Sequence, residues 1–163
     1  MNYLKSFFFS KKDLLKIIIV VIPVIIGILL YLTYRVETLK ISKWLKYVGL
    51  ESFLDFLRTD SFLQNLVIPD WIIYNLPFTL WVFSFTYLIL TIWKFQISSK
   101  NILWICIIPI IAIFSEVSQA FGLIKGTFDF KDLIMIIVSS LFPFIIIIFI
   151  KLKPNNYEKK SIS

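Results

Sequence analysis

Four long apolar runs, separated by more polar stretches, organise this chain of 163 residues. The runs cover residues 17–34, 71–93, 102–122 and 133–150, and each is close to the roughly 20 residues that a helix needs to cross a bilayer. Their many β-branched residues would favour strands in water, but in lipid a run of this length satisfies its backbone hydrogen bonds only as a helix. The pattern therefore predicts an all-α, polytopic membrane protein with four transmembrane helices, forming a single membrane domain over residues 1–152.

The polar stretches between the runs indicate a topology. Lys and Arg number ten on the side that carries both termini and seven on the other side, which by the positive-inside rule favours cytoplasmic termini. Residues 153–163 are then a polar cytoplasmic tail. Residues 36–69, on the outer side, mix aromatic and aliphatic side chains with charges. This mixture predicts short amphipathic helices that lie on the outer leaflet or cap the bundle, rather than a disordered loop.

The composition narrows the chemistry that the chain can perform. Hydrophobic residues make up 59% of it, above the roughly 45–50% of soluble domains. The sequence has no histidine and a single cysteine, Cys106, which excludes histidine-based catalysis, histidine zinc ligands and an internal disulfide. The net charge of +7 serves membrane topology in this interpretation, and we expect no nucleic-acid partner.

Polar side chains gather at one end of the predicted helices. Glu116 and Gln119 share a face near the end of the third helix. Asp129 and Asp132 lie at the start of the fourth helix, and Asn75 lies within the first two turns of the second. In the expected topology all of them fall at one depth, near the outer leaflet. A charge at mid-bilayer costs about 2.5–3.5 kcal/mol on insertion scales, and such residues usually face the bundle interior or a water-filled cavity. Polar residues from three predicted helices at the same depth therefore predict a polar site near the outer leaflet.

Each of these residues also has a purely structural interpretation. Glu116 and Gln119 can form interhelical hydrogen bonds that fix the packing of the helices. Asp129 and Asp132 can cap the fourth helix and interact with its dipole. Asn75, together with the proline two residues later, can open the second helix locally.

The order of these residues resembles that of the VanZ-like family of small bacterial integral membrane proteins. The family pairs a Glu-x-x-Gln on one hydrophobic helix with a loop and a D-x-x-D-like start of the next. Here Glu116 and Gln119 are followed by GTFDFKD, which contains Asp129 and Asp132. The similarity covers mainly residues 102–150, and Lys125 stands in the loop where family members often have an arginine. The resemblance implies a cell-envelope role in the bacterial cytoplasmic membrane and a shared polar site. It does not define a reaction.

Two functions stay open at this point. In the first, the site binds or modifies a lipid-linked or amphipathic cell-envelope molecule, and carboxylates alone provide proton transfer or hold a hard cation such as magnesium. Its candidate residues are Glu116 and Gln119 for catalysis, and Asp129, Asp132, Asn75 and Lys125 for ligand binding. We assign no metal ligands and no cofactor, and the sequence does not decide whether the protein is an enzyme.

In the second function, the chain is a non-catalytic subunit or an assembly partner of another membrane protein, and the polar cluster locks helix packing. A proton-coupled carrier is less favoured than either, because four helices without an inverted repeat would have to dimerise to form a pathway.

Overall fold

The structure, a computed structural model, describes residues 11–35, 40–60 and 66–152, and all the regular secondary structure in these ranges is helical. The long helices are α1 (Lys11–Tyr34), α5 (Leu76–Ile92), α6 (Ile102–Ala120) and α7 (Phe130–Leu152). The short ones are α2 (Lys40–Tyr47), α3 (Glu51–Asp55), the π-helical turn η2 (Phe56–Asp60) and α4 (Asp70–Tyr74). The prediction of an all-α protein is confirmed for these residues, and the predicted tail at 153–163 lies outside them.

In the part of the chain that the structure describes, three helices are long and apolar enough to cross a membrane, over Asp13–Tyr34, Ile102–Ala120 and Phe130–Phe149. The second predicted span, over residues 71–93, is divided into α4 and the shorter apolar helix α5, which has 17 residues. The division falls at Asn75, because Pro77 has no N–H to donate to the carbonyl one turn earlier and its ring crowds that turn. The local opening expected there is therefore present, and the structure shows three candidate spans.

The helices begin and end a few residues away from the predicted positions. The first begins at Lys11 rather than Ile17, because its charged flank is itself helical and pairs Lys16 with Asp13 at 2.8 Å, one turn apart. The third ends at Ala120 rather than near Gly122. Gly122 has a φ of +67° and, with the following residue, donates to carbonyls of the last turn at 3.0 and 2.9 Å. This closing arrangement favours glycine and ends the helix.

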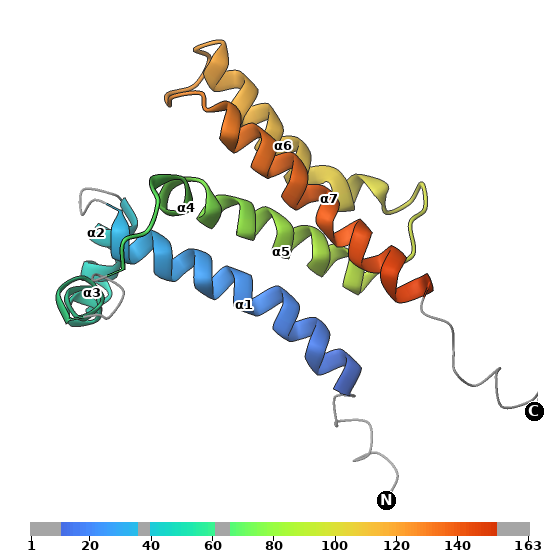
Figure 1. The fold of residues 1–163 in the computed structure, drawn as a ribbon, viewed down its shortest axis with the longest axis horizontal. Coiled ribbons are helices and arrows are strands. Elements are labelled where there is room, and N and C mark those ends of the chain that lie inside the picture. Colours follow the sequence, from blue (N-terminus) through green and yellow to red (C-terminus); the bar gives the residue numbers. More distant parts are fainter. Residues whose placement is uncertain (1–10, 36–39, 61–65, 153–163) are drawn as a thin grey trace, which may run out of the picture.

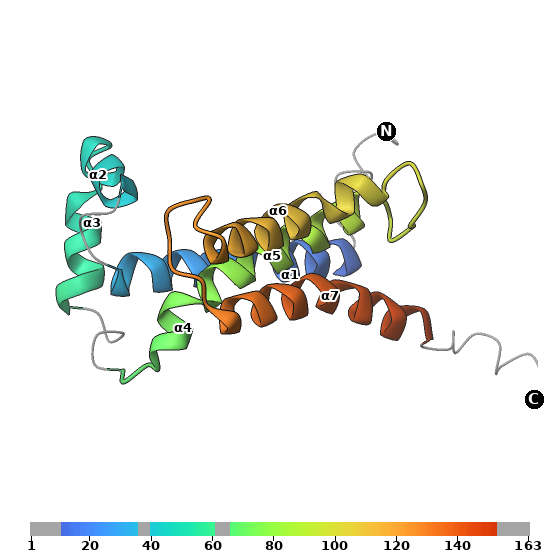
Figure 2. The same ribbon diagram turned by 90° about the horizontal axis from the view of Figure 1, so that it is seen from above.

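Helix α5 is the centre of the bundle. Figure 1 shows it between α1 on one side and α6 with α7 on the other, and it packs against all three. Viewed from above, α6 and α7 run on either side of it (Figure 2). Apolar side chains of α5, α6 and α7 form two buried clusters, which are Val82 with Ala112 and Ile136, and Leu90 with Ile105 and Ile147. Only 6% of the apolar stretch of α1 is buried, against 22% in α6 and in α7, so the outer surface is suited to lipid.

Helices α1 and α5 lie close together at Gly27. A Cβ atom at this position would lie 2.6 Å from Nε1 of Trp81 and 3.1 Å from the carbonyl oxygen of Pro77. A Cβ atom here would force the Trp81 side chain to shift and the Pro77 carbonyl to move slightly. Glycine at position 27 therefore allows α1 to pack closely on α5.

Within the segment 36–69, predicted to be amphipathic, α3 and η2 pack on the end of α1, while residues 36–39 and 61–65 lie outside the described ranges. Leu54 and Leu57, from α3 and η2, are buried against Leu32. Arg58 donates hydrogen bonds to the carbonyl oxygens of Leu32 and Arg35, each at 2.9 Å, and so satisfies acceptors that the end of a helix leaves free. The short helices thereby cover the last turn of α1 at one end of the bundle (Figure 2).

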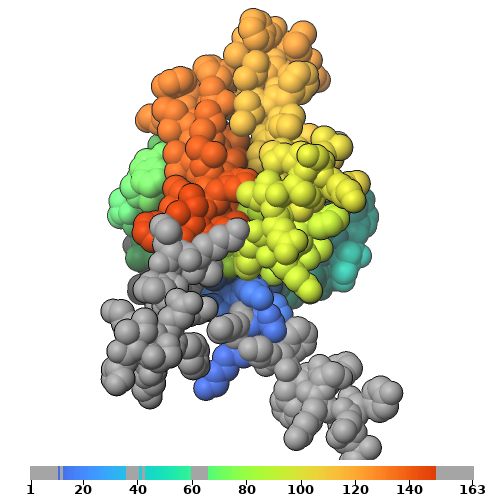
Figure 3. Space-filling model, turned by 90° about the vertical axis from the view of Figure 1, so that its right-hand side faces the viewer, coloured from blue at the N-terminus to red at the C-terminus, as the bar shows by residue number. Residues whose placement is uncertain are grey.

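The two ends of the bundle differ in what they bring together. At one end, Figure 1 places the last turn of α1, α4 and the connection between α6 and α7. At the other end, Figure 3 shows the connection over residues 93–101 beside the last turns of α7, with the start of α1 below them. The candidate site residues named from the sequence belong to the first end.

Candidate functional site

A pocket of about 630 Å³ lies where α1 ends, α4 meets α5, and α6 connects to α7. Four of the residues predicted from the sequence, Asn75, Gln119, Asp129 and Asp132, line it. The complete lining is Arg35, Asp70, Trp71, Tyr74, Asn75, Gln119, Gly126, Thr127, Asp129, Lys131 and Asp132. Most of these side chains are polar or charged, and they come from four segments that are distant in the sequence.

Asp129 has both a structural contact and a contact across the pocket. Its Oδ1 accepts a hydrogen bond from the N–H of Lys131 at 2.8 Å, and its backbone oxygen accepts from Leu133 at 3.2 Å, so the residue caps α7 as proposed from the sequence. Its other oxygen, Oδ2, accepts from Nδ2 of Asn75 at 3.5 Å. The start of α7 is thereby joined to the point where α4 and α5 divide.

Glu116 lies behind the pocket rather than in its wall. The side chain is 5% exposed, and Oε1 accepts a hydrogen bond from the backbone N–H of Asp129 at 3.0 Å. This contact spans thirteen residues of the chain and ties the end of α6 to the start of α7. The contact is of the interhelical type that stabilises packing in membranes. Glu116 therefore acts on the pocket through Asp129.

Asp132 is where the charges of the site meet. The carboxyl groups of Glu116 and Asp129, the guanidinium of Arg35 and the amide of Asn75 all lie near its side chain. The guanidinium of Arg35 thus lies close to three carboxyl groups at this end of the bundle. Such a cluster combines hydrogen-bond acceptors with a strong donor.

Arg35 is the functional candidate that the sequence analysis missed. Its Nη2 donates to the carbonyl oxygen of Tyr74 at 3.0 Å, and its guanidinium carbon lies 4.7 Å from the centre of the Tyr74 ring and 5.5 Å from that of Tyr31. Both distances are within the range of cation–π attraction. The Nε of Arg35 is buried and has no hydrogen-bond partner within the described part of the chain. In the sequence analysis this arginine entered only the count of basic residues from which the membrane topology was predicted.

The loop before α7 lies directly on Gln119. Gly126 has a φ of +154°, and a Cβ atom there would lie 2.5 Å from Oε1 of Gln119. Glycine therefore lets the loop backbone close over the amide at the rim of the pocket. Lys125, expected from the sequence as a ligand-binding residue, is exposed and does not line the pocket. The basic residue of this region that does so is Lys131.

The described acidic side chains are not arranged as a metal-binding site. Among residues 11–35, 40–60 and 66–152, no three or more cysteine, aspartate or glutamate side chains are grouped so that they could hold a metal ion. The lining of the pocket has two basic residues and three acidic ones. The site can therefore donate to and accept from a polar molecule that carries groups of both kinds.

Comparisons with models of protein families, with curated proteins and with solved structures give no match to this chain. The three apolar helices of spanning length in the described residues indicate a helical membrane protein. What the protein does must be argued from the pocket.

Proposed function

We propose that this chain is a VanZ-like integral membrane protein of the bacterial cytoplasmic membrane, whose polar pocket binds or modifies the head group of a lipid-linked or amphipathic cell-envelope molecule. In this proposal α4 and α5 together form a fourth span, both termini are cytoplasmic and the pocket lies near the outer leaflet. The observation that carries the proposal is the pocket itself. Charged and hydrogen-bonding side chains from four segments surround about 630 Å³ at the end of a bundle whose outer surface is apolar.

The size and lining of the pocket suit a head group. Ligand pockets usually have volumes of about 300–1,000 Å³ and a small number of polar groups that fix orientation. Arg35 and Lys131 suit an anionic group such as a phosphate. Asp132 and Asn75 suit hydroxyl or amine groups, and Trp71 adds an aromatic surface at the rim. The chemistry expected is therefore a head group that has both hydrogen-bond donors and an anionic group.

Binding is the activity that this geometry supports best. Asp132 faces the pocket, whereas Glu116, the candidate acid–base centre from the sequence, contacts the Asp129 backbone behind it. Within the proposal Glu116 is a positioning residue, and Asp132 is the carboxyl group that meets a bound molecule. A modifying reaction would have to use Asp132 or a water molecule that it orients.

The test is the identification of what the purified protein carries. The full chain is extracted from membranes in a mild detergent, and bound molecules are identified and quantified by mass spectrometry. Wild-type protein is compared with Asp132→Asn and Arg35→Gln, and with Asp55→Asn as a control, because Asp55 is an exposed acid of α3 outside the pocket. We expect an amphipathic molecule whose occupancy falls at least about tenfold in the two pocket variants, a change of about 1.4 kcal/mol. Equal retention in all four proteins would refute the proposal.

The interhelical contact of Glu116 favours a second function, that of a non-catalytic subunit or assembly partner. The Glu116 carboxylate is used to hold α6 against α7, as expected when polar groups serve packing. This alternative predicts that the purified protein carries a stoichiometric polypeptide. Pocket variants that leave the fold intact should then leave that polypeptide bound, which the same preparations would show.

A further inference from the structure

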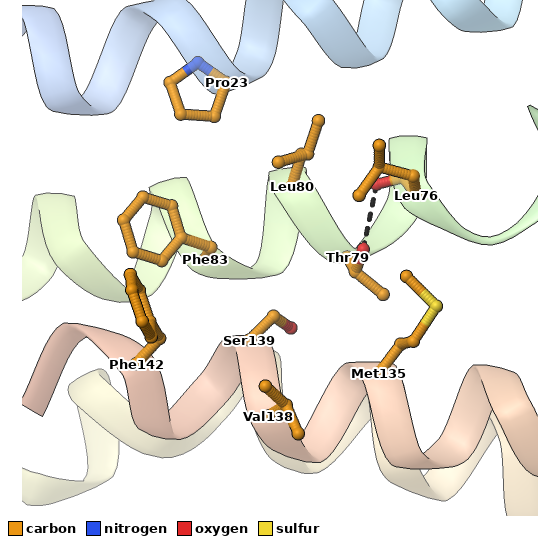
Figure 4. A pocket seen from close by; sticks show the side chains of 9 residues that line it. All are labelled: Pro23, Leu76, Thr79, Leu80, Phe83, Met135, Val138, Ser139 and Phe142. Carbon is orange, nitrogen blue, oxygen red and sulfur yellow. Dashed lines mark hydrogen bonds between the residues drawn. The ribbon is translucent and has the colours of Figure 1, made fainter. Parts of the chain in front are cut away.

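A second cavity of about 340 Å³ runs along α5 between α1 and α7, and Figure 4 shows the side chains that face it. We call it the α5 groove; its lining is Pro23, Leu76, Thr79, Leu80, Phe83, Met135, Val138, Ser139 and Phe142. The hydroxyl groups of Thr79 and Ser139 donate to carbonyl oxygens of their own helices, at 2.9 and 3.0 Å. Because these two donors are already satisfied, the groove offers an almost purely hydrocarbon surface.

The α5 groove begins where the polar pocket ends. On α5, the groove residue Leu76 directly follows the pocket residue Asn75. On α7, the groove residue Met135 lies one turn after the pocket residue Asp132, on the same face of the helix. Two helices therefore pass from polar to apolar lining at the same level. Together, the two cavities have the polarity of an amphipathic molecule.

The groove is also accessible from the side of the bundle. Helices α1 and α7 each pack along α5 rather than against each other, so α5 is the floor of the groove and the other two helices are its walls (Figure 4). Val138, on the α7 wall, is 57% exposed. A molecule in the surrounding bilayer could reach the groove without passing through the bundle.

We propose that the α5 groove holds a hydrocarbon chain of the same molecule whose head group occupies the polar pocket. This inference rests on the proposed function and adds to it that the ligand is a lipid, which enters laterally from the bilayer. Lining residues run from Leu76 to Phe83 on α5 and from Met135 to Phe142 on α7, a rise of roughly 10 Å at 1.5 Å per residue. This length is about a third of the hydrocarbon core of a bilayer.

The polar pocket beside the groove favours a lipid over a helix of a partner protein. A lipid joins a polar head group to a hydrocarbon chain, which matches the step from Asn75 and Asp132 to Leu76 and Met135. An apolar helix of a partner protein, or of a second copy of this chain, would cover the groove but bring no polar group to the pocket.

The test fills the groove without touching the polar pocket. Val138→Phe adds bulk at an exposed position of the groove wall, and Ile137→Phe is the matched control, since Ile137 is also exposed (40%), adjacent, and not part of the lining. The full chain is reconstituted into vesicles of total bacterial polar lipid and extracted again in mild detergent, and the lipid retained per protein is quantified. We expect retention to fall at least about tenfold in Val138→Phe and in Asp132→Asn, and to stay unchanged in Ile137→Phe.

The other outcomes separate the groove from the pocket. If Val138→Phe retains lipid while Asp132→Asn does not, the groove inference is wrong and the head-group site stands. If Asp132→Asn retains lipid while Val138→Phe does not, lipid is held without the polar pocket, which overturns the proposed function and the link between the two cavities. Retention in both variants overturns both proposals. An equal loss in Ile137→Phe overturns the groove, because the loss is then not specific to it.

Discussion

Replacing Glu116 by leucine tests whether its carboxylate anchors the connection between α6 and α7. Glu116 is 5% exposed, and its Oε1 accepts from the N–H of Asp129 at 3.0 Å. Leucine has similar bulk but no acceptor, so this N–H loses its partner. Leaving a buried polar group unsatisfied costs about 1–3 kcal/mol. We therefore expect amide exchange with solvent at Asp129 to accelerate by roughly 5- to 150-fold, the factors that correspond to this range.

Glu116→Gln separates the acceptor from the charge. Glutamine keeps an oxygen that can accept from Asp129, but a hydrogen bond to a charged group contributes about 1.5–3 kcal/mol and a neutral one about 0.5–1.5. The expected loss is about 1 kcal/mol, so exchange should accelerate by well under tenfold. Hydrogen–deuterium exchange measured by mass spectrometry, on peptides that cover residues 121–133 of the purified protein, gives both rates.

The control for these variants is Glu51→Leu. Glu51 is an exposed acid that pairs with Lys46 at 3.0 Å, and exposed pairs of this kind contribute about 0–1 kcal/mol. Its loss should leave exchange over residues 121–133 unchanged. If Glu116→Leu exchanges like the wild type, the carboxylate does not anchor the connection. If Glu116→Gln exchanges as fast as Glu116→Leu, the negative charge of Glu116, and not merely an acceptor oxygen at this position, holds the connection between α6 and α7.

Three further substitutions test the packing around the site. Gly27→Ala places a Cβ 2.6 Å from Nε1 of Trp81, so thermal unfolding should show a loss of about 1–3 kcal/mol; an unchanged midpoint would mean that α1 and α5 can separate freely. Gly126→Ala strains a backbone with a φ of +154° and pushes on Gln119, at a cost on the order of 1–3 kcal/mol, and should reduce retained lipid; full retention would contradict it. Arg58→Met removes two hydrogen bonds to the end of α1 and should speed amide exchange over residues 51–60; exchange at the wild-type rate would show that Arg58 does not hold this segment.

The helices could be predicted because their length is a physical requirement of the bilayer. Runs of about 20 apolar residues have one stable backbone conformation in lipid, and the predicted positions of the first, third and fourth helices agree with candidate spans. Their ends differ because the apolar pattern records where lipid begins, whereas the helix continues into the charged flank, as at Lys11. The break at Asn75 followed from Pro77, whose missing N–H is a local property.

The site could be predicted where its residues lie within the apolar runs or directly beside them. Asn75, Gln119 and Asp132 were placed by helix depth and face, and the structure brings them to one pocket. Arg35 was missed because its position depends on the Tyr74 carbonyl, thirty-nine residues further along the chain. Lys125 was expected in the pocket from its position between Gln119 and Asp129, but the turn at Gly122 and the loop after it leave it exposed.

The central position of α5 implies that the chain does not tolerate amino-acid changes equally along its length. Helix α5 has neighbours in α1, α6 and α7, so a substitution at one of its many buried positions, such as Val82, Thr86 or Leu90, meets protein. Helix α1 has 6% of its apolar stretch buried, and its exposed apolar positions should accept one apolar residue for another. Natural variation among descendants of this sequence should therefore accumulate along the first helix and leave the middle one nearly constant.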